Sequence, residues 1–140
     1  MIVLDTNVLS EVLKPAPDER VLHWLADLDP AAVFTTAVTQ AEILSGVEIL
    51  PTGRRRAQLL QAVEDMFATD FGGRILAFDD AAARAFAQIV TVRESIGRPI
   101  SQFDAMIAAI VRSHRGEAIA TRNTTDFERC GINVMNPWTA

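Results

Sequence analysis

Short apolar runs alternate with longer helical patterns along the 140 residues of this chain. Five runs have the length and the apolar or β-branched content of buried strands: Met1–Leu4, Ala32–Thr36, Arg74–Phe78, Ala118–Ala120 and Ile132–Met135. Strands that alternate with helices are joined by right-handed crossovers, which favour a parallel sheet with helices on both faces. The sequence therefore predicts a three-layer α/β/α fold with a central, mostly parallel sheet.

The segments between these runs have the apolar spacing and the end signals of helices. The predicted helices are Thr6–Leu13, one capped by Asp18, Thr39–Leu50, Arg54–Ala68, one from Asp79-Asp80 to about Gly97, and one capped by Ser101. We interpret Asp79 as a helix cap, because Asp is a preferred residue at that position, and leave it out of the candidate site.

Length and composition favour one domain. With 49% apolar residues, the chain is long enough to bury one core and short for two, so we expect residues 1–140 to form a single domain. No apolar run approaches the roughly 18 residues of a membrane span, and the amino terminus has no basic flank. We therefore expect a soluble, cytoplasmic protein without a membrane partner. The single cysteine, Cys130, excludes an internal disulfide and a cysteine-rich zinc site.

Four acids follow predicted strands or open predicted helices: Asp5, Glu42, Asp104 and Asp126. The carboxyl ends of parallel strands meet at one edge of a sheet, so these side chains are expected to converge there. Two carboxylates about 5 Å apart repel by roughly 3 kcal/mol at an effective dielectric of 20, and four ionised acids in one pocket need positive charge. Hard divalent ions such as Mg²⁺ or Mn²⁺ can supply it.

Each acid also has a purely structural interpretation. Asp5 could cap the following helix, although Thr6 or Asn7 could cap it instead. The patterns Thr39-x-x-Glu42 and Ser101-x-x-Asp104 match the capping box, in which the acid bonds back to the cap residue. Asp126 could be an exposed loop acid. The common register of the four acids at strand ends and helix starts favours a shared site.

The charge pattern leaves the partner open. A formal net charge of −5 argues at first against nucleic acid, although divalent ions at the acids would neutralise most of that excess. Every basic residue except Lys14 is an arginine, whose planar guanidinium can bind two phosphate oxygens at once, which a lysine ammonium does less well. The run Arg54-Arg55-Arg56 begins a predicted helix, where the positive end of the helix dipole disfavours cations. These arginines could be a solvated helix face, a rim that contacts phosphates, or a contact for an acidic patch on a partner.

Five short motifs along the whole chain together resemble one family of proteins. They are Val3-Leu4-Asp5-Thr6-Asn7, Thr39-Gln40-Ala41-Glu42-Ile43, Phe103-Asp104-Ala105, Thr121-Arg122-Asn123-x-x-Asp126-Phe127 and Asn136-Pro137-Trp138. In their order and spacing they are similar to PIN-domain endoribonucleases of the VapC toxin type, in the FitB-like branch of type II toxin–antitoxin systems. The resemblance implies a PIN-like fold, RNA cleavage that depends on Mg²⁺ or Mn²⁺, a homodimer, and inhibition by a cognate antitoxin.

The family's acid positions map onto Asp5, Glu42, Asp104 and Asp126. The resemblance also places the hydroxyls of Thr6 and Thr121 near these acids. Some relatives carry a further acid near the position of Asn123, and an amide there removes one charge. We therefore expect one metal ion, held chiefly by Asp5 and Asp104, rather than two.

The expected mechanism is in-line attack on a phosphodiester by a water whose pKa a metal lowers, leaving a 5′-phosphate and a 3′-hydroxyl. Glu42 or Asp126 could orient this water, and Arg122 or the run Arg54–Arg56 could hold the RNA backbone. A haloacid-dehalogenase-like or receiver domain also places an acid after its first strand, but both need a late lysine, and Lys14 is too early. The remaining alternative is a non-catalytic module whose acidic pocket binds an arginine-bearing protein.

Overall fold

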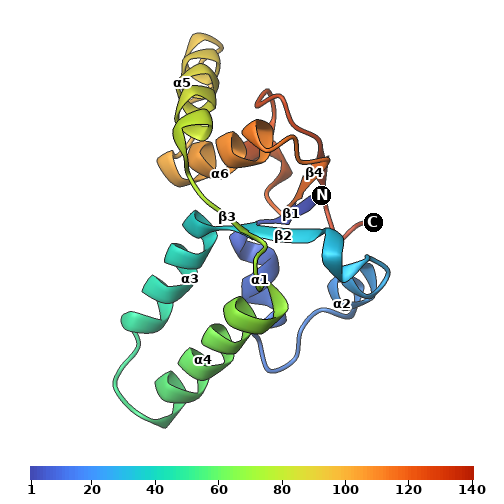
Figure 1. The fold of residues 1–140 in the computed structure, drawn as a ribbon, viewed down its shortest axis with the longest axis vertical. Helices are drawn as coiled ribbons and strands as arrows, with labels where there is room; N and C mark the ends of the chain where they lie inside the picture. Colours follow the sequence, from blue (N-terminus) through green and yellow to red (C-terminus); the bar gives the residue numbers. More distant parts are fainter.

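The computed structural model describes all of residues 1–140 and places a five-stranded sheet at the centre of the molecule (Figure 1). The strands are β1 (Ile2–Leu4), β2 (Val33–Thr36), β3 (Ile75–Leu76), β4 (Ala118–Ala120) and β5 (Val134–Met135). Their order is β3-β2-β1-β4-β5, and every neighbouring pair is parallel. The predicted parallel sheet is therefore confirmed.

The strand order reverses direction beside β1. The chain runs outward from β1 to β2 and β3, then returns to place β4 on the other side of β1. Open α/β sheets bind ligands at the carboxyl ends of their strands, at the point where the order reverses. Leu4 of β1 is in register with Ala120 of β4. The next residues, Asp5 and Thr121, therefore leave the sheet side by side.

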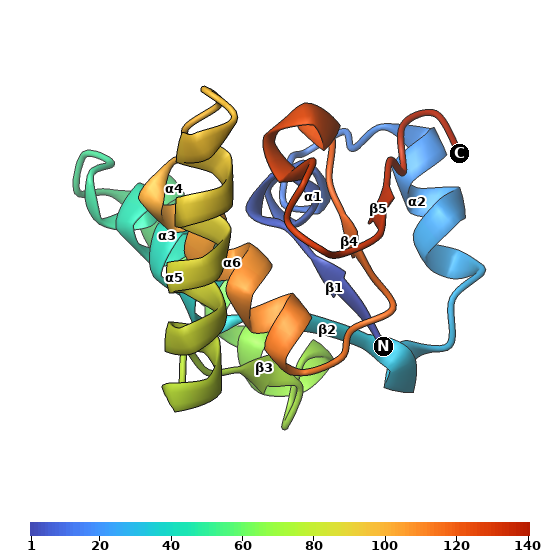
Figure 2. The same cartoon turned by 90° about the horizontal axis from the view of Figure 1, so that it is seen from above.

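Helices cover both faces of this sheet, as the two views of Figures 1 and 2 show. They are α1 (Thr6–Val12), α2 (Glu19–Ala26), α3 (Ala37–Glu48), α4 (Arg54–Asp65), α5 (Asp80–Ser95) and α6 (Gln102–Ser113). Short 3-10 turns span Pro30–Ala32 (η1) and Thr124–Phe127 (η3), and α4 continues into a π-helical turn, Met66–Asp70 (η2). None of the helices combines the length and the apolar content that crossing a membrane requires.

The buried apolar side chains form two clusters, because successive strand residues point to opposite faces of the sheet. Val3 and Ile119 pack with α5 and α6 on one face. Leu4 and Ala120 pack on the other face with side chains of α1, α2, α3 and α4. Fully burying a large aliphatic side chain contributes about 1.5–3 kcal/mol, so both clusters hold helices against the sheet. The predicted three-layer arrangement is confirmed.

The C-terminal segment closes one edge of the second cluster. Trp138 is buried there, and the C-terminal segment runs beside α2 in both views (Figures 1 and 2). Asn136 holds its position, since the Asn136 side chain accepts a hydrogen bond from the backbone N–H of Trp138 at 2.9 Å. The tail is therefore packed against the body of the molecule.

Three local predictions were wrong. Helix α3 begins at Ala37 and not at Thr39, because Thr36 caps it by accepting the Thr39 backbone N–H at 3.0 Å. Glu42 therefore lies in the second turn, outside any capping box. Strands β3 and β5 are shorter than predicted, since only Ile75 and Leu76 pair with β2 and only Val134 and Met135 pair with β4.

Candidate active site

A cavity of about 400 Å³ opens at the carboxyl end of β1, and only one of its eleven lining residues is hydrophobic. Asp5 reaches it from the end of β1, Glu42 from α3, and Asp104 from the first turn of α6. Three acids that lie far apart in the sequence therefore share one pocket. Asp126 is exposed on η3 and does not line the pocket.

Asp5 is buried, with 4% of its surface exposed, and its carboxylate accepts three hydrogen bonds. Its Oδ1 accepts the backbone N–H of Thr6 at 2.8 Å, so Asp5 caps α1 and the alternative caps Thr6 and Asn7 are wrong. Its Oδ2 accepts the Thr121 hydroxyl at 2.8 Å and the Asn7 amide at 3.3 Å. Asp5 thus serves as a helix cap and as a pocket acid at once.

No ion pair joins a basic side chain to Asp5, Glu42 or Asp104. Burial raises the pKa of Asp5 from 3.8 to about 6, against the hydrogen bonds from Thr121 and Thr6 that lower it. The charges of Asp104 and Glu42 raise it further. A cation at the acids would reverse this effect, because an opposite charge favours the ionised carboxylate.

Glu42 is joined to Asp5 through Thr6. The Thr6 hydroxyl donates to Glu42 Oε1 at 2.8 Å and lies 3.2 Å from the hydroxyl of Thr39. Since the Thr6 backbone N–H binds Asp5, one residue holds both acids. The hydroxyls that the sequence placed near the site, on Thr6 and Thr121, do lie there.

Asp104 and Asp126 interact by charge on the α6 side of the site. Ser101 caps α6 as predicted by accepting the backbone N–H of Asp104 at 3.2 Å. Burial raises the pKa of Asp104, the bond to Ser101 lowers it, the charge of Asp126 raises it again, and Arg93 opposes this. Asp126 is thus close enough to act on Asp104, although it lies outside the pocket.

Arg93 is a supporting residue that the sequence did not reveal. It is 4% exposed, and its guanidinium donates to the backbone carbonyls of Arg98 at 2.6 Å, Asp126 at 2.8 Å and Glu128 at 3.0 Å. It therefore fixes the segment that carries Asp126. The sequence does carry one signal for its burial, because Arg93 follows the buried residues Ala85 and Ile89 of α5 at intervals of four residues and so lies on the same helix face.

The predicted basic residues lie in different places. Arg122 lines the pocket, where its backbone N–H donates to Asn7 at 3.2 Å. The neighbouring Asn123 also lines the pocket. Arg54 and Arg55 are exposed at the start of α4, and Arg56 pairs with Glu48 at 2.8 Å. None of these three lines the pocket, so only Arg122 joins the acids.

The acids fit a hard divalent cation in donor type and in charge. Carboxylate oxygens are the ligands that Mg²⁺ and Mn²⁺ prefer, and the raised pKa values show that positive charge would be stabilising. No three acidic, histidine or cysteine side chains yet stand close enough to hold a metal ion. Ion binding would therefore exchange some of the hydrogen bonds to Asp5 and Glu42 for metal–oxygen contacts.

Comparison with known proteins agrees with this geometry. Residues 2–132, which include all four acids, match the PIN domain family. Toxin FitB of Neisseria gonorrhoeae is 41% identical over 138 residues, 99% of either chain. The VapC ribonuclease Y4jK of Sinorhizobium fredii is 38% identical over 99% of this chain and 98% of that protein. In the crystal structure of FitAcB from Neisseria gonorrhoeae, a chain 40% identical superposes with a TM-score of 0.93, and both chains are covered completely.

Proposed function

Because the chain belongs to the PIN-domain family, we propose that it is a divalent-metal-dependent endoribonuclease and the toxin of a type II toxin–antitoxin pair. The observation that carries this proposal is the gathering of Asp5, Glu42 and Asp104 in one polar pocket at the carboxyl end of the sheet. Relatives of similar length are named a toxin and a ribonuclease, which supports both halves of the proposal.

Asp5 and Asp104 would hold the metal ion, Mg²⁺ or Mn²⁺. Once bound, such an ion lowers the pKa of a water and neutralises charge on the leaving oxygen. The chain supplies orientation: Thr121, Asn7 and the Thr6 backbone keep the Asp5 carboxylate fixed, and Thr6 holds Glu42. Water would attack phosphorus and the 3′-oxygen would leave with a proton, giving 5′-phosphate and 3′-hydroxyl ends.

One ion suits the site better than two. Asn123 places a neutral amide at the pocket, and Asp126 is exposed outside it. Asp126 would then act by its charge and by helping to orient the water with Glu42. This assignment of roles to Asp5, Glu42, Asp104 and Asp126 is part of the proposal.

The remaining partners follow from the same proposal. Exposed Arg54 and Arg55 would contact the RNA backbone beyond the pocket, while Arg56 is already paired with Glu48. A cell that makes an active ribonuclease must restrain it, so a cognate antitoxin is expected. The large apolar side chains Val92 and Phe103 are exposed on α5 and α6, which would favour a homodimer of this single domain.

The decisive experiment is cleavage of RNA by the purified protein with Mg²⁺ or Mn²⁺. Matched reactions contain EDTA, or the variants Asp5→Asn and Asp104→Asn, with folding checked by circular dichroism. Cleavage that needs both the metal and the acids, and leaves 5′-phosphate ends, is the expected result. Cyclic-phosphate products would overturn the proposed mechanism.

A second function is favoured by one observation, namely that the pocket acids do not surround a common point. An arginine side chain could pair with them without such closure. The chain would then be a non-catalytic module whose acidic pocket binds an arginine-bearing protein. Folded protein that leaves a broad RNA pool intact, yet binds such a partner through Asp5 and Asp104, would favour this alternative.

A further inference from the structure

The pocket that holds the three acids also has a basic side. It extends past the end of α1, because Thr6 and Ser10 of that helix line it together with Lys14. Lys14 follows two residues after Val12, the last residue of α1, so Thr6 and Lys14 lie at opposite ends of this stretch of chain. The acids lie near the first of these residues, and Lys14 and Arg122 supply the positive charge of the lining. The pocket is therefore longer than a metal site alone requires.

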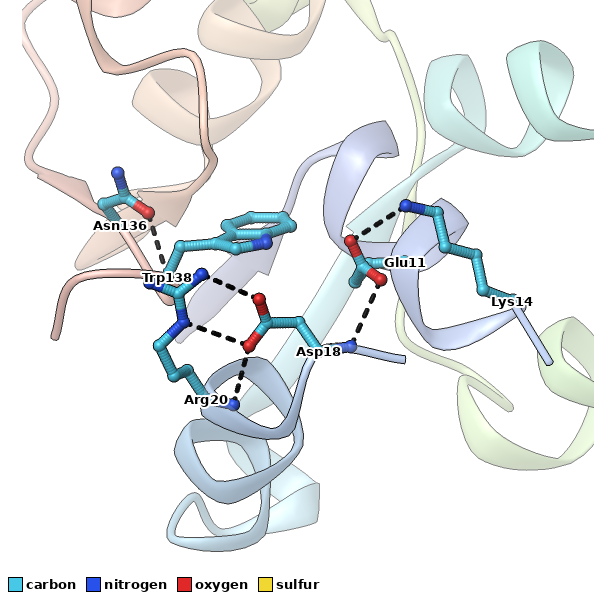
Figure 3. A network of polar contacts seen from close by, with 6 residues as sticks. All are labelled: Glu11, Lys14, Asp18, Arg20, Asn136 and Trp138. Carbon is cyan, nitrogen blue, oxygen red and sulfur yellow. Dashed lines mark hydrogen bonds and ion pairs between the residues drawn. The ribbon is translucent and has the colours of Figure 1, made fainter. Parts of the chain in front are cut away.

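Lys14 is held in place by a buried acid. Its Nζ lies 3.1 Å from Glu11 Oε1, and Glu11 Oε2 accepts the backbone N–H of Asp18 at 3.2 Å (Figure 3). Glu11 is buried, and the hydrogen bond from Lys14 lowers its pKa. The Lys14 side chain itself is 58% exposed. The Lys14 ammonium is thus paired with Glu11 through one N–H donor, and its other donors are free to bind a ligand.

Arg122 stacks on an aromatic ring and has no acceptor in the protein. Its guanidinium carbon lies 5.2 Å from the ring centre of Trp138, which is itself buried. The backbone N–H of Arg122 is bonded, but its side chain makes no hydrogen bond and no ion pair within the chain. The nearby Asp18 is occupied by Arg20, whose Nη2 lies 2.7 Å from Asp18 Oδ2 (Figure 3). The stack therefore orients the guanidinium and leaves its donors unused.

We propose that Lys14 and Arg122 form a binding subsite for a backbone phosphate of the RNA strand, adjacent to the phosphodiester that is cut. The identity of the strand rests on the proposed ribonuclease function. Guanidinium and ammonium groups bind phosphate oxygens through charge-assisted hydrogen bonds. The carboxylates at the other end of the pocket repel phosphates unless a cation is bound there. A strand that enters the pocket therefore places its uncut phosphate at Lys14 and Arg122.

Neither group forms an ion pair with Asp5, Glu42 or Asp104. Lys14 pairs with Glu11, a fourth acid of the pocket lining, and Arg122 pairs with no acid. Trp138 fixes the Arg122 guanidinium without satisfying its N–H donors, as an aromatic face does. An oriented guanidinium with unused donors and a half-exposed ammonium in the lining of one pocket are suited to binding a phosphate group.

The test is the salt dependence of RNA binding in EDTA, which prevents metal-dependent cleavage. The probe is a fluorescein-labelled single-stranded RNA, and the variants are Lys14→Gln, Arg122→Gln and the double variant. Each phosphate contact contributes about −0.7 to the slope of log K against log salt for single strands. Because both side chains contact one phosphate, we expect the double variant to reduce the steepness by about 0.7 and each single variant by part of that amount.

Arg84→Gln is the matched control, because Arg84 is an exposed arginine on α5 whose ion pair with Asp80 lies outside the pocket. It removes the same charge and should leave the slope unchanged. Lys14→Arg and Arg122→Lys should keep the slope, and Arg122→Lys should bind more weakly because it loses the planar stack on Trp138. Equal slopes for Lys14→Gln, Arg122→Gln and Arg84→Gln would overturn the subsite.

Cleavage with Mg²⁺ separates this proposal from the proposed function. The subsite predicts that Lys14→Gln and Arg122→Gln raise KM several-fold and leave kcat largely unchanged. If the wild-type chain cuts RNA and both variants cut it with wild-type KM, the subsite is wrong and the ribonuclease stands. If the wild-type chain binds RNA with the expected slopes and cuts none, the ribonuclease is wrong and the subsite stands. Absence of both binding and cleavage would overturn both.

Discussion

The hydroxyl of Thr121 donates to Asp5 Oδ2 at 2.8 Å, across the junction between β4 and β1. The same hydroxyl oxygen accepts the Asn7 side-chain amide at 3.0 Å and the backbone N–H of Asn123 at 3.1 Å. Thr121 is fully buried, so no water can replace these bonds. One threonine therefore fixes the direction of the central acid and the start of the segment that leads to Asp126.

Replacing Thr121 by valine should destabilise the protein by about 1–3 kcal/mol, because the buried Asp5 carboxylate loses a donor and the part-buried donors of Asn7 and Asn123 lose an acceptor. It should also raise the pKa of Asp5 further, since the Thr121 hydrogen bond lowers that pKa. Urea unfolding at pH 7 measures the first effect. Thr121→Ser keeps the hydroxyl and is the control; equal stability of the valine and serine variants would contradict the role assigned to this bond.

Asp5 should make the metal-free protein less stable as the pH rises. Its pKa is about 6 in the folded protein and 3.8 in the reference state, so the folded protein binds more protons between these values. Stability then falls as the pH rises through this window, by roughly 3 kcal/mol for a gap of this size. Urea unfolding in EDTA, compared between wild type and Asp5→Asn from pH 4 to pH 7, isolates this contribution.

The variant Asp5→Asn should lack that slope, so the wild type should lose about 3 kcal/mol relative to it across the window. Added Mn²⁺ should restore wild-type stability at pH 7, because a ligand that binds only the folded state stabilises it. Parallel stability curves for the two proteins in EDTA would show that the Asp5 pKa is not raised.

Asp104→Asn should weaken Mn²⁺ binding by at least about tenfold, since the loss of a residue that only hydrogen-bonds to a metal ligand already weakens metal binding by about 10–100-fold. Asp126→Asn should have a smaller effect, because Asp126 is exposed and lies outside the pocket. Isothermal titration calorimetry with Mn²⁺ provides the measurement. Asp79→Asn is the control, since Asp79 is likewise an aspartate at the start of a helix but does not line the pocket.

Arg93→Met should lower the free energy of unfolding by about 1–3 kcal/mol, because the part-buried carbonyls of Asp126 and Glu128 lose their donor. Hydrogen exchange should become faster in residues 123–131, which this guanidinium holds. Arg98→Gln is a sharp control: Arg98 also contacts Glu128, through an exposed ion pair that contributes little. If both variants exchange at the wild-type rate, Arg93 does not order this segment.

The parts of the fold that depend on local signals could be predicted from the sequence. The caps Asp18, Asp79 and Ser101 are confirmed, because each offers a side-chain acceptor directly before a helical pattern. The start of α3 could not be chosen in this way. Thr36 and Thr39 are equally good caps, and the choice depends on the pairing of Thr36 with Leu76 of β3, which is a tertiary contact.

The same division holds for the site. That Asp5, Glu42 and Asp104 share a pocket could be predicted, because the carboxyl ends of parallel strands meet at one edge. The burial of Arg93 could not, since an arginine at a buried helical position commonly extends to the surface. Its burial depends on the backbone of residues 126–128, whose path is set by packing between distant parts of the chain.

The position of β4 determines when, during synthesis of the chain, the pocket can form. This strand is the direct neighbour of β1 in the sheet, yet more than a hundred residues of polypeptide are made between the two. A ribosome that has synthesised β1, β2 and β3 holds a chain with Asp5 and Glu42 but without Thr121, Arg122 or Trp138. The pocket is therefore incomplete on every growing chain until β4 and the segment through Trp138 have been translated. Any chemistry that needs the complete pocket therefore has to wait until nearly the whole chain has been made.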